Sequence, residues 1–242
     1  HVGAMAARVA RALVAAALLV ASASGLALPC PAGEWDGFPP SRRSEFMRDY
    51  WGRRPLLIRG LTTPQEAAIV GPDELAGLAC EDGVEARIVC EKGLGPDPWA
   101  LLHGPFEPED FSHLPEGAPW ALLVQEANLA LPRAAALLQA RLAHVPHWRA
   151  DDVMVSYAED GGGIGPHVDN YDVFLLQGGG SRRWCVQERT VPASEEGLVP
   201  GVGVRVLREF EADKSWVLQP GDCLYLPPRV PHRGVALGPG CV

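Results

Sequence analysis

Two segments of the chain carry residue types that bind metal ions. His167 and Asp169 are separated by one residue, and His232 follows much later. On extended chain, residues i and i+2 leave the same face of a strand, so this pair can reach one ion. A third ligand must come from another strand, and His232 comes just after a strand-like run. Two histidines and one carboxylate on one side of an ion form the facial triad of non-haem Fe(II) oxygenases.

The residues around the first pair strengthen a signal that is weak alone. A surface histidine beside a capping aspartate has the same His-x-Asp spacing. Here a glycine-rich run, residues 161–166, directly precedes His167, and such a backbone suits tight turns at the mouth of a barrel. The spacing from Gly161 to His167 resembles the first motif of the cupins.

The second segment resembles the second cupin motif. Gly221, Pro227 and His232 fall at the expected spacing, while Arg229 and Ala236 replace its Gly and Asn. Neither replaced position is a metal ligand. The other histidines lack ligand spacing and are interpreted as structural or surface residues; those singled out are His103, His113, His144 and His147.

A facial triad leaves positions open for a 2-oxo acid, whose distal carboxylate then needs a cation. Arginine suits this role because its guanidinium pairs bidentately with a carboxylate. Arg182 and Arg183 follow a glycine-rich turn, and alternation lets only one face inward. Arg182 shares its face with Trp184 and is predicted to anchor 2-oxoglutarate, although two solvated arginines fit the spacing equally well. Ser156 or Tyr157 would add a neutral hydrogen bond.

The pattern of short strands and Gly/Pro turns favours a mainly β fold with flanking N-terminal helices. We expect a double-stranded β-helix, the cupin/JmjC jelly roll, with the helices packed outside it. Ser41 is expected to cap the first helix, and residues 171–176 and 182–187 to pair as a hairpin. Expected helices span 41–51, 72–80 and 132–142; expected strands span 55–58, 84–90, 120–126, 153–157, 171–176, 182–187, 215–218, 223–226 and 234–237.

Composition sets limits on the class of protein. The 242 residues are 47% hydrophobic and 21% charged, which is typical of a globular chain. A net charge of −9 argues against non-specific nucleic-acid binding, so no direct nucleic-acid contact is expected. The six cysteines contain no CxxC pair, which favours buried free thiols over a zinc site or a disulfide framework.

The N-terminus has the pattern of a cleaved targeting segment. Arg8 and Arg11 precede an apolar run that ends at Leu28, and no acidic residue comes before Glu34. The run is just short of a comfortable membrane span, so the mature chain is expected to have none. The predicted organisation is a targeting segment, 1–28, a linker, 29–40, and an oxygenase domain, 41–242.

Several longer stretches resemble the bacterial-type ribosomal oxygenases, which are cupin-like JmjC hydroxylases. The resemblance covers roughly residues 38–242, and its main segments are 54–60, 72–79, 103–106, 151–157, 161–178, 182–184 and 218–228. It implies Fe(II) bound by His167, Asp169 and His232, with 2-oxoglutarate bound by Arg182. It further implies hydroxylation of an arginine, or a histidine, in a ribosomal protein.

The resemblance also raises expectations about what surrounds the site. Family members continue with a closing strand, a helical dimerisation region and a further domain. We therefore expect an incomplete barrel, no dimerisation region, and a loosely held His232 whose strand lacks one neighbour. A ribosomal substrate favours a plastid or mitochondrion, with the secretory pathway as the alternative. Competing functions are a cupin isomerase or dioxygenase without 2-oxoglutarate, and a JmjC demethylase.

Overall fold

Eleven strands form three sheets in the described part of the chain. The computed structural model describes residues 33–91, 99–114 and 117–242; the expected targeting segment, 1–28, lies outside them. The first sheet has the order β1 (Glu34–Asp36), β2 (Leu56–Arg59), β10 (Cys223–Leu226), β7 (Val173–Leu176). The second has the order β11 (His232–Leu237), β8 (Ser181–Val186), β9 (Lys214–Leu218). The third has the order β4 (Trp99–His103), β3 (Ala86–Glu91), β5 (Trp120–Val124), β6 (Val155–Ala158).

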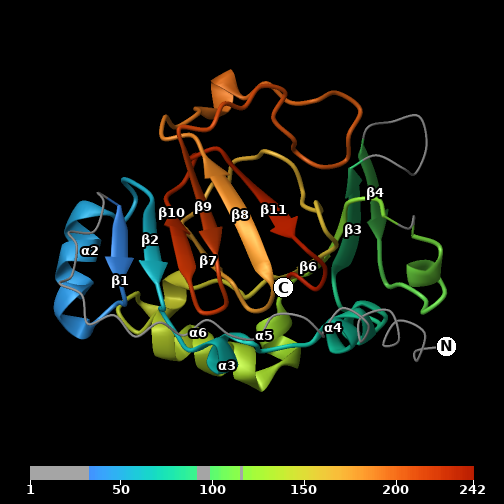
Figure 1. Cartoon of the computed structure of the whole chain (residues 1–242), viewed down its shortest axis with the longest axis horizontal. Helices are drawn as coiled ribbons and strands as arrows, with labels where there is room; N and C mark the ends of the chain where they lie inside the picture. Colours follow the sequence, from blue (N-terminus) through green and yellow to red (C-terminus); the bar gives the residue numbers. More distant parts are fainter. Residues whose placement is uncertain (1–32, 92–98, 115–116) are drawn as a thin grey trace, which may run out of the picture.

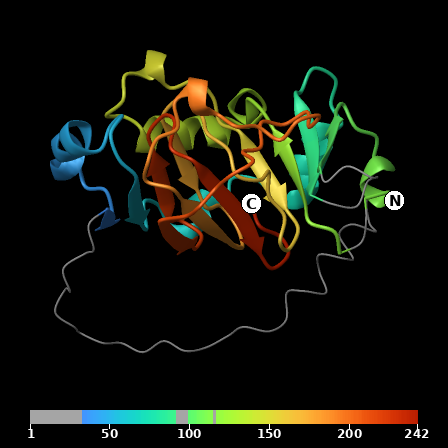
Figure 2. The same ribbon diagram turned by 90° about the horizontal axis from the view of Figure 1, so that it is seen from above.

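The sheets face one another across apolar cores, as the jelly-roll prediction requires (Figures 1 and 2). Leu57 and Leu224 of the first sheet pack against Trp184 and Leu218 of the second. Ala236 of β11 packs in turn against the third sheet. The predicted double-stranded β-helix is confirmed, and α2 and the β3–β4 pair lie at opposite ends of it (Figure 1).

The helices pack on the outer faces of the sheets, as expected (Figure 1). They are α2 (Arg43–Asp49), α3 (Pro64–Ala67), α4 (Pro72–Ala79), α5 (Ala127–Ala130) and α6 (Pro132–Arg141), with short 3₁₀ turns η2 (Pro40–Arg42), η3 (Asp110–Ser112), η4 (His147–Arg149) and η5 (Ala193–Glu195). The predicted cap at Ser41 is wrong, because Ser41 lies inside η2 and α2 begins after Arg42 without a side-chain cap. None of the described helices is long and apolar enough to span a membrane.

The predicted hairpin between β7 and β8 is wrong. β7 pairs with β10, whereas β8 pairs with β11 and β9. The glycine turn between them, residues 178–180, passes from one sheet to the other. The amides of Gly178 and Gly179 donate to the carbonyl of Val242 at 3.0 and 3.1 Å. The glycine turn therefore marked the break between the two strands to within two residues, but it did not show which strands they pair with.

The outer edge of β11 is not open, contrary to the expectation for His232. Ala236 exchanges backbone hydrogen bonds with the 161–162 turn, since Gly161 N donates to Ala236 O and Ala236 N donates to Gly162 O, both at 3.0 Å. His232 opens β11 rather than preceding it, and it is 1% exposed. The turn before His167 and His167 itself thus pair with β11, so the predicted lack of a neighbour is wrong.

The prediction of buried free thiols holds for three of the five cysteines in the described residues. Cys80, Cys90, Cys185, Cys223 and Cys241 are all free thiols, and three of them are buried. Cys30 lies outside the described residues.

Candidate metal centre and carboxylate pocket

The structure brings His167, Asp169 and His232 together. One potential ligand atom from each lies within 4.8 Å of the others, and this is the only such cluster in the described residues. Two reciprocal backbone hydrogen bonds join the two ligand-bearing segments. His167 N donates to His232 O at 3.0 Å, and His232 N donates to His167 O at 2.9 Å. The backbone therefore fixes the two histidines side by side, with ring centroids 4.2 Å apart.

Each histidine ring is oriented by its Nδ1 atom. His167 Nδ1 lies 2.9 Å from the carbonyl of Gly165, and His232 Nδ1 lies 3.0 Å from that of Val230. A carbonyl only accepts, so each Nδ1 carries the proton and each Nε2 keeps its lone pair. Hydrogen bonds of this kind orient the histidine ligands of metal centres. The donor set fits a first-row divalent cation.

Burial keeps the His232 ring in the neutral form that can bind a cation. It lowers the pKa of His232 to about 3, so the ring is neutral at physiological pH. His232 Nε2 lies 3.5 Å from Asp169 Oδ2, and with a neutral ring this contact is not an ion pair. Burial also raises the pKa of the Asp169 carboxyl, while the neighbouring His167 opposes that rise. A bound cation would favour the ionised carboxylate, because it adds an opposite charge beside it.

The structure also brings Arg182 and Ser156 together. Arg182 Nη1 donates to Ser156 Oγ at 3.0 Å, and Arg182 Nε lies 3.3 Å from Cys241 Sγ. Arg182 Nη2 is buried and has no hydrogen-bond partner among the described residues. A buried N–H group without an acceptor is costly, so this atom fits a site for an incoming carboxylate.

Strand alternation places the arginine as the sequence predicts. Arg183 is exposed, whereas Arg182 is partly buried on the face of the buried Trp184. Its guanidinium lies 5.9 Å from the Trp184 ring. Tyr157, the alternative to Ser156, is excluded: its hydroxyl donates to Glu159 at 2.6 Å and its ring packs on Trp120, on the opposite face of β6.

Arg229 is a residue of the site that sequence reasoning passed over. It has φ +66°, which explains the glycine at this position of the cupin motif. Its amide donates to the carbonyl of Asp169 at 2.8 Å, and its guanidinium donates to Asn170 at 2.8 Å and to Glu196 at 3.0 Å. Arg229 therefore ties the second motif to the Asp169 segment. The departure from glycine was the signal that pointed to it.

Comparisons with known proteins agree with this fold and this site. The JmjC domain family matches residues 137–242. The chain is 41% identical over 194 residues to the ribosomal protein uL16 3-hydroxylase of Escherichia coli, covering 80% of this chain and 49% of that protein. It is 39% identical to a probable ribosomal oxygenase of Haemophilus influenzae, covering 79% of this chain and 46% of the relative.

Solved structures give the same result. The E. coli ribosomal oxygenase YcfD in complex with cobalt and 2-oxoglutarate superposes with a TM-score of 0.65 and 39% identity, over 81% of this chain and 48% of that one. A complex of YcfD with cobalt and succinic acid has a TM-score of 0.65 and 38% identity, over 82% of this chain and 49% of that one.

The fold and the sequence match together define a JmjC-type jelly roll. Within that class, the chain belongs to the bacterial-type ribosomal oxygenase family. It spans about half the length of the relatives it matches.

Proposed function

We propose that this chain carries the catalytic domain of an Fe(II)- and 2-oxoglutarate-dependent hydroxylase of a ribosomal protein. The observation that carries the proposal is the pairing of the His167–Asp169–His232 cluster with a buried Arg182 Nη2 that has no partner among the described residues. Metal cupins that do not use a 2-oxo acid have no need for such an arginine. The cobalt and 2-oxoglutarate bound by YcfD support the same cofactors here.

The register of β8 and β11 explains how both halves serve one co-substrate. Arg182 pairs with Ala236, and Val186 pairs with His232. Paired residues point to the same face of a sheet, so Arg182 and His232 project together. Four residues of strand separate their Cα atoms by about 13 Å along the sheet. A diacid of glutarate length, bound to Arg182 at one end and to the metal ion on His232 at the other, would span this distance.

The residues of the chain divide the work between binding and orientation. His167, Asp169 and His232 would hold the metal ion, which when bound supplies dioxygen activation. Arg182 and the Ser156 hydroxyl would hold the distal carboxylate, and Arg182 donates to Ser156 so that the hydroxyl proton is free for the co-substrate. The buried Trp184 ring lies beside the Arg182 guanidinium and would exclude water from it.

An acidic, aromatic entrance supports a cationic side chain as the substrate. Tyr171, two residues after Asp169, is 62% exposed. Burial and the charges of Asp169, Asp152 and Asp151 raise the pKa of its phenol, and the charge of Arg87 opposes that rise. Asp152 is held by Gln125 Nε2 at 2.8 Å and by Glu126 N at 3.1 Å. A guanidinium fits carboxylates and an aromatic face, which favours arginine over histidine as the target.

The proposal is tested by conversion of 2-oxoglutarate to succinate with Fe(II) and a peptide of ribosomal protein uL16. The wild-type chain should couple succinate formation to a mass increase of one oxygen on the peptide. Asp169→Ala should reduce both to background with the melting temperature retained. Asp73→Ala removes an exposed carboxylate on α4 and should match wild type. Retained turnover in Asp169→Ala would exclude the assignment. Metal-dependent turnover that needs no 2-oxoglutarate would favour another cupin class.

A further inference from the structure

Positive charge is concentrated around α2, at the end of the molecule away from β3 and β4. Five arginines and only two acidic residues fall between Arg42 and Arg54. Arg42 pairs with Glu45 and Arg48 pairs with Asp49, which uses both carboxylates. Arg43, Arg53 and Arg54 form no ion pair within the described residues, and the last two are exposed.

An exposed indole adjoins these charges. Trp148 of η4 is 74% exposed, and its neighbour Arg149 is exposed as well. The Arg149 guanidinium lies 6.0 Å from the Trp148 ring and 5.6 Å from the Trp51 ring. Trp51 follows α2 and directly precedes the Gly52–Arg53 turn. Arg149 thus lies between the Trp148 ring of η4 and the Trp51 ring at the end of α2.

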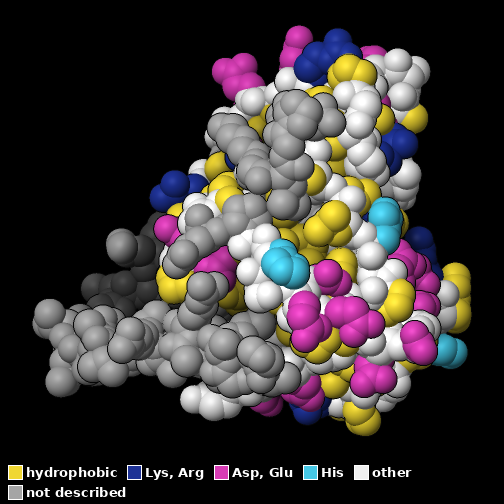
Figure 3. Space-filling model, turned by 90° about the vertical axis from the view of Figure 1, so that its right-hand side faces the viewer, with side chains coloured by type: hydrophobic (Ala, Val, Ile, Leu, Met, Phe, Trp, Pro, Cys, Tyr) yellow, Lys and Arg dark blue, Asp and Glu magenta, His cyan; other side chains and the backbone are white. Residues whose placement is uncertain are grey.

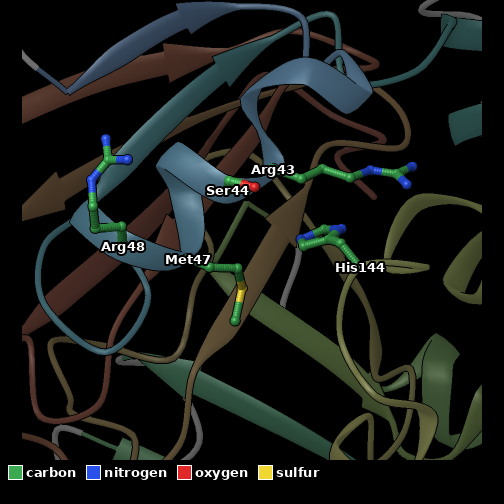
Figure 4. Close-up of a pocket in the computed structure, with 5 residues that line it drawn as sticks. All are labelled: Arg43, Ser44, Met47, Arg48 and His144. Atoms are coloured by element: carbon green, nitrogen blue, oxygen red, sulfur yellow. The ribbon is translucent and has the colours of Figure 1, made fainter.

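A hollow opens beside α2 (Figure 4). It is shallow and open to solvent, and it is lined by Arg43, Ser44, Met47, Arg48 and His144. Arg43 and Arg48 extend from α2 on opposite sides of it (Figure 4). Arg43 Nε is buried and has no hydrogen-bond acceptor in the described part of the chain. A phosphate group is small enough for this hollow and would supply that acceptor.

We propose that this surface, the arginine–tryptophan face (Arg43, Arg48, Arg53, Arg54, Arg149, Trp148), binds single-stranded nucleic acid. Guanidinium groups would contact successive phosphates, and an unpaired base would stack on the free face of Trp148. This combination of a positive track and an aromatic platform recognises single strands without sequence preference. A duplex offers phosphates but no unpaired base. The inference goes beyond the proposed hydroxylase, because no residue of this face belongs to the metal centre.

The net charge of −9 does not prevent nucleic-acid binding at this face, because the charges are unevenly distributed. Exposed acidic residues gather at the other end of the molecule, around η3, where Glu107, Glu109 and Asp110 all lie exposed (Figure 3). Exposed charges farther apart than about 8 Å are largely screened at physiological salt. A phosphate at α2 is therefore screened from these distant carboxylates, and the nearer Asp49 and Asp172 are engaged by Arg48 and by Gly52 N and the Tyr225 hydroxyl. The overall charge predicts no nucleic-acid binding, whereas its distribution favours binding at this end.

The test is fluorescence anisotropy with a short labelled oligouridylate, across a range of salt concentrations. Wild-type chain should bind with a dissociation constant on the order of 10 μM at low salt. The triple variant Arg53→Gln, Arg54→Gln, Arg149→Gln should bind at least tenfold more weakly. Its salt slope should fall by about 2, since each lost phosphate contact on a single strand removes about 0.7.

Four further variants separate charge, stacking and folding. The corresponding triple lysine variant keeps the charges but loses the arginine hydrogen bonds to the carbonyls of Trp51 and Asp49, and it should retain binding. Trp148→Ala should weaken binding about tenfold with the salt slope unchanged, while Trp148→Phe should bind nearly as wild type. A matched triple glutamine variant at the exposed Arg183, Arg189 and Arg208 should have no effect.

Each contrary outcome overturns the proposal in a definite way. Equal losses in the patch and control variants would show bulk charge attraction rather than a site. Tighter binding to polyglutamate, with no effect of Trp148→Ala, would assign the face to an acidic protein. Binding only to anionic phosphatidylserine vesicles would assign it to a membrane surface. Self-association that the patch variant removes, without oligouridylate binding, would assign it to the acidic end of a second copy.

Discussion

Two regions of this molecule bury a histidine, and only one of them is built to bind a metal. Burial lowers the pKa of His232 in the metal centre to about 3 and that of His144 beneath α2 to about 4. His232 Nδ1 is engaged by the carbonyl of Val230. Neither nitrogen of His144 has a partner among the described residues. Its ring packs on Phe38 and Phe46 at centroid distances of 4.8 and 5.5 Å.

The difference shows that burial and a lowered pKa do not by themselves mark a ligand. A hydrogen bond from Nδ1 to a carbonyl does mark a ligand, because it fixes the tautomer. It leaves the lone pair of Nε2 directed at the point where the metal ion would bind. His144 behaves as an aromatic packing residue, as its spacing in the sequence predicts. The two regions can therefore be separated by experiment.

The largest effect is expected from replacing each of these histidines by leucine. His232→Leu should abolish 2-oxoglutarate turnover, because it removes one of the three proposed ligands. His144→Leu should leave turnover unchanged, because it replaces an unpartnered buried ring by an apolar side chain. Succinate formation and cobalt titration of both variants measure the contrast. Loss of cobalt binding in His144→Leu would remove the distinction between the regions.

The next largest effect concerns the arginine that complements the metal centre. Arg182→Gln should raise the KM for 2-oxoglutarate by about 10- to 100-fold, as expected for losing a charge-assisted pair. Arg183→Gln, one residue along and exposed, should have no effect. Steady-state kinetics with 2-oxoglutarate varied provides the measurement. Similar KM values for the two variants would mean that the carboxylate pocket lies elsewhere.

A third effect tests how the backbone holds His167 beside His232. A Cβ added at Gly163 would lie 2.2 Å from the carbonyl oxygen of Gly234 in β11. Gly163→Ala should therefore lower the free energy of unfolding by about 1–3 kcal/mol and weaken cobalt binding. Gly197→Ala meets nothing within 4 Å and should change neither. Urea denaturation of the two variants checks the first effect. Unaltered cobalt affinity in Gly163→Ala would show that the turn does not position the ligand.

The smallest effect is the pH dependence that His144 contributes. Its pKa is about 4 in the folded chain, because burial lowers it from the ordinary histidine value of 6.5. The unfolded chain therefore binds more protons between these values, and stability is lost as the pH falls from about 6.5 towards 4. His144→Leu should lose about 1 kcal/mol less than wild type between pH 7 and pH 5. Replacing the exposed His147 by leucine should not alter the profile.

Local patterns were sufficient to predict the fold class and to single out most of the candidate site. The spacing of His167 and Asp169, and the alternation that turns Arg182 inward, depend only on residues close in sequence. The partners of β7 and β8 depend on contacts between distant strands, and the pairing of two apolar runs across a glycine turn was predicted wrongly. The role of Arg229 was hidden for the same reason, because its partners Asp169 and Glu196 lie far away in the chain.

The reciprocal hydrogen bonds between His167 and His232 make the two ligand segments a single unit of local opening. Each amide is held by the carbonyl of the other residue, so hydrogen exchange at the two positions should be slow and should occur together. A metal ion bound by both rings would add a second link across the same pair. Its effect on exchange should therefore be concentrated at these two amides and at the β11–β8 ladder behind them, while the amides of α2 keep their original rates.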